Sequence, residues 1–333
     1  MRPPTDAPNS SSPTPGTRKP ALLLAGLLAI LLGLALTAQN QSVRPAEEFT
    51  IRRDVDLVVV HTTVVDHKGR LVTELNREHF KVFEDGVEQA LAVFQNEDIP
   101  VTVGLVLDNS ASMTDKLREM MAAALTFVET SNRQDEVFVV NFNSDYYLDL
   151  EGKDFSSDLD ELEEALGRTA TRGSTSLFDA LRASLEHSKR GTRQKKVLLV
   201  ISDGVDNTSY SDFDTLLREA QESETALYLI GLPCTDSKRD CRQAKRRLRK
   251  LAEVTGGNAY FPVLNDPIEP LCRKIAHDIR NQYILGYYPS NPARDGRFRN
   301  VRVEIRAPKN FGRLLARHRS GYYASSSGPA GSQ

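Results

Sequence analysis

The sequence of 333 residues carries almost no excess charge of either sign, with a formal net charge of −2 and a pI near 6.3. A balance of this kind gives no reason to expect nucleic acid or an anionic membrane surface as a partner. One dense basic stretch, residues 245–250, is interrupted by Leu248, and apolar residues recur around it at helical spacing. This pattern is typical of a solvated helix face.

Signatures of several common enzyme classes are also missing. The sequence contains no G-x-S-x-G elbow, no Gly-rich phosphate loop ending in Lys-Ser or Lys-Thr, and no His-Glu-x-x-His. The six histidines are scattered along the chain, at His61, His67, His79, His187, His277 and His318. We therefore predict that the protein is not an enzyme.

Cysteine is scarce, with only Cys234, Cys241 and Cys272 in the chain. Cys234 and Cys241 are close in sequence, so in an oxidising compartment outside the cytosol they could form a disulfide that closes a short loop. Cys272 falls on an apolar helical stripe with Ile268 and Ile275. A thiol in that position is expected to be buried and unreactive.

Polar side chains are missing from Ala21 to Leu36, directly after a tail over residues 1–20 that is rich in Pro, Ser and Thr. This predicts an export segment over residues 21–38, either an uncleaved transmembrane signal-anchor or a signal peptide. The long tail favours the anchor, while the small residue Ala35, at the third position before a cut after Thr37, keeps cleavage after Thr37 or Ala38 open. Because the basic residues precede the apolar run, everything after Gln39 is expected outside the cytoplasmic membrane, either anchored and periplasmic or secreted.

A chain of this length exceeds what one ordinary hydrophobic core uses, so we expect two folded units. Residues 50–96 are patterned as strands, and Asp85-Gly86 separates two of the runs as a hairpin turn would. Residues 266–324 contain a helical stripe followed by further strand patterns, and we expect this helix and these strands to pack with the β-rich unit. Residues 325–333 form a predicted disordered tail. Since the two ends of an inserted domain lie close together, the flanking segments predict one β-rich unit.

Residues 100–265 change to short apolar runs separated by amphipathic helical stretches. The apolar runs have the length of strands that are buried on both faces, at residues 101–107, 137–142, 197–201 and 226–232. This alternation predicts an α/β fold with a doubly wound, mostly parallel sheet. Ligands of such folds bind at the carboxyl ends of the strands.

Oxygen-bearing side chains gather at the predicted strand ends. Asp108, Ser110 and Ser112 follow the first run, Thr175 lies in a small-residue loop before a helix, and Asp203 follows the third run. Carboxylates and hydroxyls without nitrogen or sulfur ligands suit a hard cation such as Mg²⁺. The alternative, that these residues only cap a helix and form turns, requires no ligand.

These loops resemble the metal-ion-dependent adhesion site of von Willebrand factor A and integrin I domains. That site consists of a D-x-S-x-S loop, a Thr in a second loop and an Asp in a third, and this chain has all three in order. The resemblance covers about residues 100–265. With the flanking residues 82–89, 282–288 and 319–323, the chain also resembles a bacterial von Willebrand factor A-related protein of the acidobacterial type.

The resemblance implies a Rossmann-like domain that holds one Mg²⁺ ion, or Mn²⁺ or Ca²⁺ in its place. Ser110 and Ser112 would bind the ion through their hydroxyls, Thr175 directly or through water, and Asp108 and Asp203 mostly through water. The open position would take an Asp or Glu carboxylate of another protein. The resemblance therefore implies a protein-binding module for adhesion or assembly. Together with the export segment it predicts an extracytoplasmic module, either attached to the membrane through its N-terminal segment or secreted.

Two other interpretations remain open. A Mg²⁺-dependent hydrolase or phosphotransferase of the haloacid dehalogenase kind also places an Asp at a strand end. Its second Asp lies two residues later, where this chain has Ser110, so the acid/base group is missing. The other alternative is a structural envelope protein with a vestigial site, although the complete set of candidate ligands argues against it.

Overall fold

The computed structural model describes residues 57–168, 170–264, 266–306 and 311–326. The chain divides into two units, Met1–Arg53 and Asp54–Gln333, and every described residue belongs to the second. The predicted export segment, residues 21–38, and the predicted tail before it lie outside the described residues. Within the described ranges, no helix is both long enough and apolar enough to cross a membrane.

The central sheet consists of six strands: β5 (Val101–Asp108), β6 (Glu136–Phe142), β7 (Tyr146–Leu148), β8 (Lys195–Ser202), β9 (Thr225–Gly231) and β10 (Asn258–Tyr260). Their order is β10–β9–β8–β5–β6–β7. All neighbours pair in parallel except β7, which is antiparallel to β6. The predicted α/β fold with a mostly parallel sheet is confirmed.

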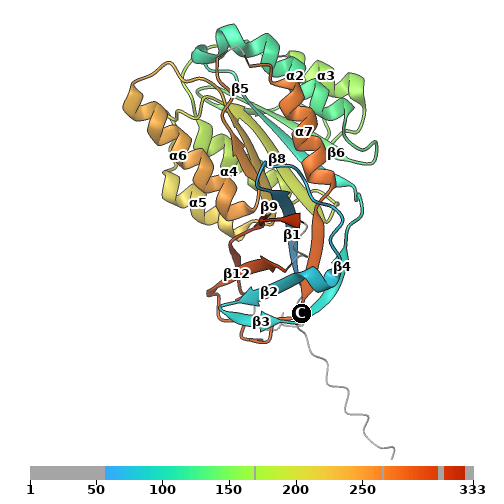
Figure 1. The fold of residues 1–333 in the computed structure, drawn as a ribbon. Helices are drawn as coiled ribbons and strands as arrows, with labels where there is room; N and C mark the ends of the chain where they lie inside the picture. The colour runs from blue at the N-terminus through green and yellow to red at the C-terminus, as the bar shows by residue number, and fades with distance from the viewer. Residues whose placement is uncertain (1–56, 169, 265, 307–310, 327–333) are drawn as a thin grey trace, which may run out of the picture. The chain divides into compact units, whose positions relative to one another are not determined.

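Helices cover both faces of this sheet (Figure 1). One face carries α2 (Leu117–Glu129), α3 (Leu159–Gly167) and α7 (Glu269–Arg280), and the other carries α4 (Leu177–Ser188), α5 (Phe213–Glu222) and α6 (Lys238–Thr255). Successive side chains of β5 enter opposite cores, Leu105 and Leu107 on the α2 side and Val106 on the α4 side. Burial on both faces explains why the central strands are apolar without alternation.

The C-terminal helix α7 differs from expectation in its packing. It was expected to pack with the β-rich unit, but its apolar stripe joins the core between the central sheet and α2. Cys272 lies fully buried in that stripe, and burial raises the pKa of its thiol to about 12. The expectation of a buried thiol is confirmed, and at neutral pH the thiol stays protonated.

The basic stretch forms part of α6, whose buried side carries Ala244, Leu248 and Leu251. The helix begins after the N-cap Ser237, whose side chain accepts a hydrogen bond from Asp240 N, and ends at Gly256 with φ 79°. The basic residues 245–250 lie on the outer side of α6, as predicted. They differ from a purely solvated face because several of their cations lie over aromatic rings. These pairs are Lys245 and Arg249 over Phe261, and Arg247 over Phe178 and Phe213.

Two antiparallel sheets form the β-rich unit. The first has the order β13 (Leu314–Arg317), β1 (Val58–Asp66), β11 (Tyr283–Tyr287) and β4 (Leu91–Gln95). The second has the order β14 (Gly321–Tyr323), β12 (Phe298–Ile305), β2 (Phe80–Glu84) and β3 (Val87–Gln89). Each sheet combines strands from both flanks of the central domain, and the two share one apolar core. The prediction of a β-rich unit built from the flanking segments is confirmed.

The hairpin between β2 and β3 has positive φ angles at both turn residues, 46° at Asp85 and 85° at Gly86. Such a turn matches the twist of the two strands and explains why an Asp-Gly pair stands there. The structure also contains elements that the sequence did not predict, among them α5 and the short strands β7 and β10. Residues 87–94, which the sequence predicts as one strand, divide between β3 and β4 in different sheets.

One buried cation makes the stability of this fold depend on pH. The Lys195 ammonium donates a hydrogen bond to Ile279 O, and burial lowers the pKa of Lys195 from 10.5 to about 7, against the opposing effect of Asp98 and Asp135. Between these two values the unfolded chain binds a proton that the folded chain lacks. The free energy of unfolding therefore rises as the pH is raised through this window.

Lys195→Met removes this titration. We expect wild-type protein to gain stability relative to Lys195→Met as the pH rises from about 7 to about 10, by up to ~4 kcal/mol, because each pKa unit corresponds to about 1.36 kcal/mol. Urea unfolding at several pH values measures the difference. Lys196→Met, which changes the neighbouring exposed ammonium, is the matched control and should keep the wild-type profile. Parallel profiles for wild type and Lys195→Met would contradict the expectation.

Candidate metal centre

The five predicted site residues lie at the carboxyl edge of the central sheet. Asp108 is the last residue of β5, and Ser110 and Ser112 follow it in the turn that leads through the 3₁₀ helix η2 (Ala111–Lys116) into α2. Asp203 follows β8 directly, and Thr175 precedes α4. Because β5 and β8 are parallel neighbours in register, their two following loops meet at this edge.

Hydrogen bonds connect four of these residues in one chain. Asp108 Oδ1 accepts from Ser110 N at 2.9 Å, Ser110 Oγ lies 3.1 Å from Ser112 Oγ, and Ser112 Oγ donates to Asp203 Oδ2 at 2.8 Å. The other oxygen of Asp108 accepts from Ser202 Oγ at 2.6 Å. Two hydroxyls therefore stand between two carboxylates, in the order that the sequence pattern predicted.

Thr175 joins this cluster through its backbone. Its N–H donates to Asn207 Oδ1 at 2.9 Å, and its carbonyl accepts from Asn207 N at 3.1 Å, which fixes it to the loop after β8. On the other side, Ala111 N donates to Gly173 O at 3.2 Å. Within the part of the chain that the structure describes, the Thr175 hydroxyl makes no hydrogen bond to the other four predicted residues.

Both carboxylates at this edge are buried, with exposed fractions of 0% for Asp108 and 3% for Asp203. Burial raises the pKa of Asp108 to about 6, hydrogen bonds from Ser110 and Ser202 oppose this shift, and the charge of Asp203 adds to it. None of the largest contributions to this pKa shift comes from a basic side chain. The ionised form of Asp108 is thus costly here, and a cation placed among these oxygens would offset the cost.

The donor set fits a hard cation. Its side-chain atoms are carboxylate and hydroxyl oxygens, the ligands that Mg²⁺ and Ca²⁺ take, and no imidazole or thiolate stands among them. In the described residues, no group of three or more His, Cys, Asp or Glu side chains could hold a metal ion. A centre at this edge therefore depends on the serine hydroxyls as much as on the carboxylates.

The neighbouring residues Asp179, Asp206 and Asn207 brace the loops. The two carboxylate oxygens of Asp179 accept from Tyr210 N at 2.7 Å and from Ser211 N at 3.1 Å. Asp206 Oδ1 accepts from Phe178 N at 3.1 Å at the start of α4. Each of these side chains is therefore engaged in holding a backbone segment.

Sequence reasoning missed Ser202. It is the last residue of β8, directly before Asp203, and its hydroxyl accepts from Gly204 N at 2.9 Å while it donates to Asp108. The signal in the sequence was a Ser placed between an apolar strand and an Asp. In the structure, the register of β5 with β8 pairs Ile201 with Leu107 and so brings Ser202 beside Asp108. This residue connects the two acidic strand ends.

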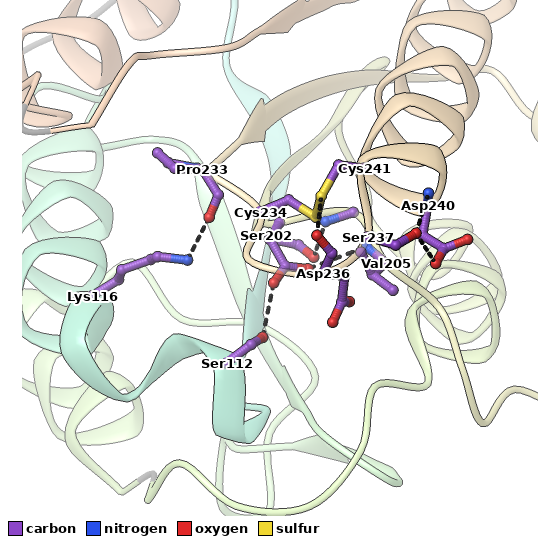
Figure 2. Close-up of a disulfide and its surroundings, with 12 residues drawn as sticks. Ser112, Lys116, Ser202, Val205, Pro233, Cys234, Asp236, Ser237, Asp240 and Cys241 are labelled. Carbon is purple, nitrogen blue, oxygen red and sulfur yellow. Dashed lines mark hydrogen bonds between the residues drawn. A yellow bond between two sulfur atoms is a disulfide. The ribbon is translucent and has the colours of Figure 1, made fainter.

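A disulfide closes the loop that follows β9. Cys234 and Cys241 are bonded, with their Cα atoms 5.7 Å apart, and Figure 2 shows this loop in the same neighbourhood as Ser112 and Val205. Lys116 Nζ, from the end of η2, donates to Pro233 O at 2.6 Å. The disulfide loop is therefore tied to the segment that carries Ser110 and Ser112.

Residues 102–266 match the family model of the von Willebrand factor type A domain. No curated protein matches this chain. Among solved structures, the chain is similar to an aerotolerance-related membrane protein from Bacteroides fragilis NCTC 9343, with 18% identity and a TM-score of 0.43 over 54% of this chain and 98% of that one. It is also similar to a von Willebrand factor type A protein from Catenulispora acidiphila, with 11% identity and a TM-score of 0.45 over 81% and 74% of the two chains.

A third similar structure is the vWF domain of the type V pili tip protein Mfa5 from Porphyromonas gingivalis. The identity is 13% and the TM-score 0.45, over 55% of this chain and 97% of that one. At these identities and scores the likeness carries no conclusion about function. The assignment of the domain rests on the family model.

Replacing both bonded cysteines, Cys234→Ser with Cys241→Ser, should lower the free energy of unfolding by about 2 kcal/mol, because the unfolded chain regains the freedom of the closed loop. Denaturant unfolding without reductant measures the loss. Adding a reductant should lower the stability of wild type to that of the variant and leave the variant unchanged. Equal stability of both proteins without reductant would show that the loop adds nothing to the fold.

Proposed function

Because residues 102–266 form a von Willebrand factor type A domain, we propose that this chain binds a partner protein through one divalent cation at the carboxyl edge of the central sheet. Domains of this family commonly take part in protein–protein interaction and adhesion, and they are usually not enzymes. The proposal assigns Asp108, Ser110, Ser112, Thr175 and Asp203 as the residues that hold the ion, with Mg²⁺ as its natural occupant.

The observation that carries the proposal is the pair of buried carboxylates with two hydroxyls between them. Ser110 and Ser112 would offer neutral oxygens, while Asp108 and Asp203 would accept hydrogen bonds from those hydroxyls or from bound water. The bound ion supplies positive charge to a carboxylate that approaches from outside. Since most of the protein oxygens nearest the ion are neutral, that charge remains available to an Asp or Glu of the partner.

Exposure differs among the five residues in the way that partner binding requires. Asp108, Ser110, Thr175 and Asp203 are buried, whereas Ser112 is exposed. The buried residues fix the geometry of the centre, and the exposed one marks the side from which an acidic group can enter. The partner therefore approaches along the direction in which the central strands point.

We place this module outside the cytoplasmic membrane. The apolar run at residues 21–36 and the basic residues before it support export, and the Cys234–Cys241 disulfide fits an oxidising compartment. Export leaves the carboxyl edge of the sheet accessible to other envelope or extracellular proteins. Retention through a signal-anchor and release after cleavage are both compatible with this role.

The two alternatives lack comparable support. A phosphotransferase of the haloacid dehalogenase kind needs an acid/base carboxylate at position 110, and Ser110 is instead hydrogen-bonded between Asp108 and Ser112. A structural protein with a vestigial site would have no reason to keep Asp108 buried, since burial of its ionised carboxylate costs stability.

Asp108→Ala combined with Ser110→Ala should reduce the affinity for Mg²⁺ or Mn²⁺ by more than about tenfold. Removing a group that only orients a metal ligand already lowers metal affinity by about tenfold or more, and removing the ligands themselves should lower it at least as much. Wild-type binding itself should be weak, since neutral hydroxyls dominate. Calorimetry of the full chain measures both affinities. Thr114→Ala removes an exposed hydroxyl of η2 outside the centre and is the matched control. Unchanged metal affinity in the double variant would place the centre elsewhere.

Proteins of the cell envelope that the immobilised chain retains in Mg²⁺ should be released by EDTA. Thr175→Ala and Asp203→Ala should retain less, since each removes a proposed ligand of the ion. Prior amidation of the carboxyl groups of the envelope proteins should abolish retention, and circular dichroism controls for folding. Metal-independent retention of equal strength in wild type and both variants would overturn the carboxylate–metal mode.

A further inference from the structure

A groove of about 820 Å³ lies next to the candidate metal centre, lined by residues of α4, α5 and the start of β7. Two serines at its edge lead to the centre. Ser176 follows Thr175 directly, and Ser144 Oγ accepts a hydrogen bond from Ser174 N at 2.9 Å. A partner segment that places a carboxylate at the centre can therefore continue into this groove.

Exposed aromatic side chains flank the groove. Tyr146 is 42% exposed, and Tyr210, in the loop that connects β8 to α5, is fully exposed. Tyr146 begins β7, which is the outermost strand at its end of the central sheet within the described residues and which also exposes Tyr147 and Leu148. Large exposed aromatic residues beside a groove are typical of surfaces that contact another protein.

The charge of the groove selects the chemistry of the segment that fits. Its lining contains two cations, and both are already paired: Arg182 with Glu219, at 2.7 Å for Nε–Oε2, and Lys189 with Glu186. Three further carboxylates line the same groove, those of Asp145, Asp179 and Glu222. Two cations against five carboxylates leave a formal charge of −3. Such a lining repels acidic peptides and phosphates and attracts Lys and Arg.

We propose that this groove binds a basic segment of the partner, with Lys or Arg side chains close in sequence to the Asp or Glu that reaches the metal centre. The inference rests on the proposed function and adds the sequence chemistry of the partner. Arg and Lys side chains would meet the carboxylates that no cation of the groove pairs with, above all those of the exposed Asp145 and Glu222, and the faces of Tyr146 and Tyr210. In this proposal the metal centre binds the Asp or Glu carboxylate of the partner, and the groove selects for Lys or Arg residues near that carboxylate in the partner's sequence.

Three fluorescently labelled peptides probe the full chain in Mg²⁺. The first has the sequence Gly-Glu-Gly-Lys-Gly-Lys, the second replaces both Lys with Gln, and the third replaces Glu with Gln. The first peptide should bind about fivefold more tightly than the second, as expected for exposed ion pairs and contacts with aromatic rings. This preference should shrink at high salt, because the groove lies at the surface.

Asp145→Lys with Glu222→Lys should remove the preference for the Lys peptide and leave Mg²⁺ affinity unchanged. Both residues are exposed and lie outside the centre. Glu129→Lys with Glu163→Lys makes the same change of charge at exposed positions of α2 and α3, on the other face of the sheet, and should keep the preference. This control separates the groove from the net charge of the chain.

The outcomes distinguish the two claims. Equal binding of the Lys and Gln peptides, or a preference that survives Asp145→Lys with Glu222→Lys, would overturn the groove even if binding needs Mg²⁺ and Glu. A preference for Lys that disappears in the groove variant but is unaffected by EDTA and by loss of Glu would support the groove and contradict the metal mode. Failure of the Glu–Lys peptide to bind at the highest soluble concentration would also overturn the groove proposal.

Discussion

The burial of Asp108 without a basic partner is the constraint on which the candidate site depends. Its carboxylate stands fully buried at the end of the central strand β5, where it accepts hydrogen bonds from Ser110 and Ser202. The second buried carboxylate, Asp203, reaches the same place because β8 pairs in parallel with β5. The fold therefore brings two carboxylates to one sheet edge, and neither forms an ion pair with a described residue.

Hydrogen bonds connect the loops at this sheet edge to one another. Asn207 fixes Thr175, Asp179 holds the backbone at Tyr210, and Lys116 joins η2 to the disulfide loop. These bonds preorganise the hydroxyls and carboxylates before any ligand arrives, which lowers the ordering cost of binding. The same bracing shapes the acidic groove beside the centre, so the two proposed contact regions share one rigid rim.

Much of this arrangement could be predicted from the sequence. Apolar strand runs and the D-x-S-x-S order gave the sheet and placed Asp108, Ser112 and Asp203 at one edge. The helix α5 escaped prediction because it buries only Leu216 and Ala220, too few positions to define a stripe. The role of Ser202 depends on the register between β5 and β8, which the local sequence does not determine. The packing of α7 depends on which part of the central sheet the other helices leave uncovered, and the local sequence does not determine this either.

The most direct test of the metal centre is a crystal of the protein soaked in Mn²⁺ and measured for anomalous scattering. The account predicts one strong anomalous peak within coordination distance of the hydroxyl oxygens of Ser110 and Ser112, on the side of Thr175, at about 2.0–2.3 Å as for small hard cations. A map in which Mn²⁺ binds elsewhere, with the hydrogen bonds among Asp108, Ser112 and Asp203 unchanged, would contradict it.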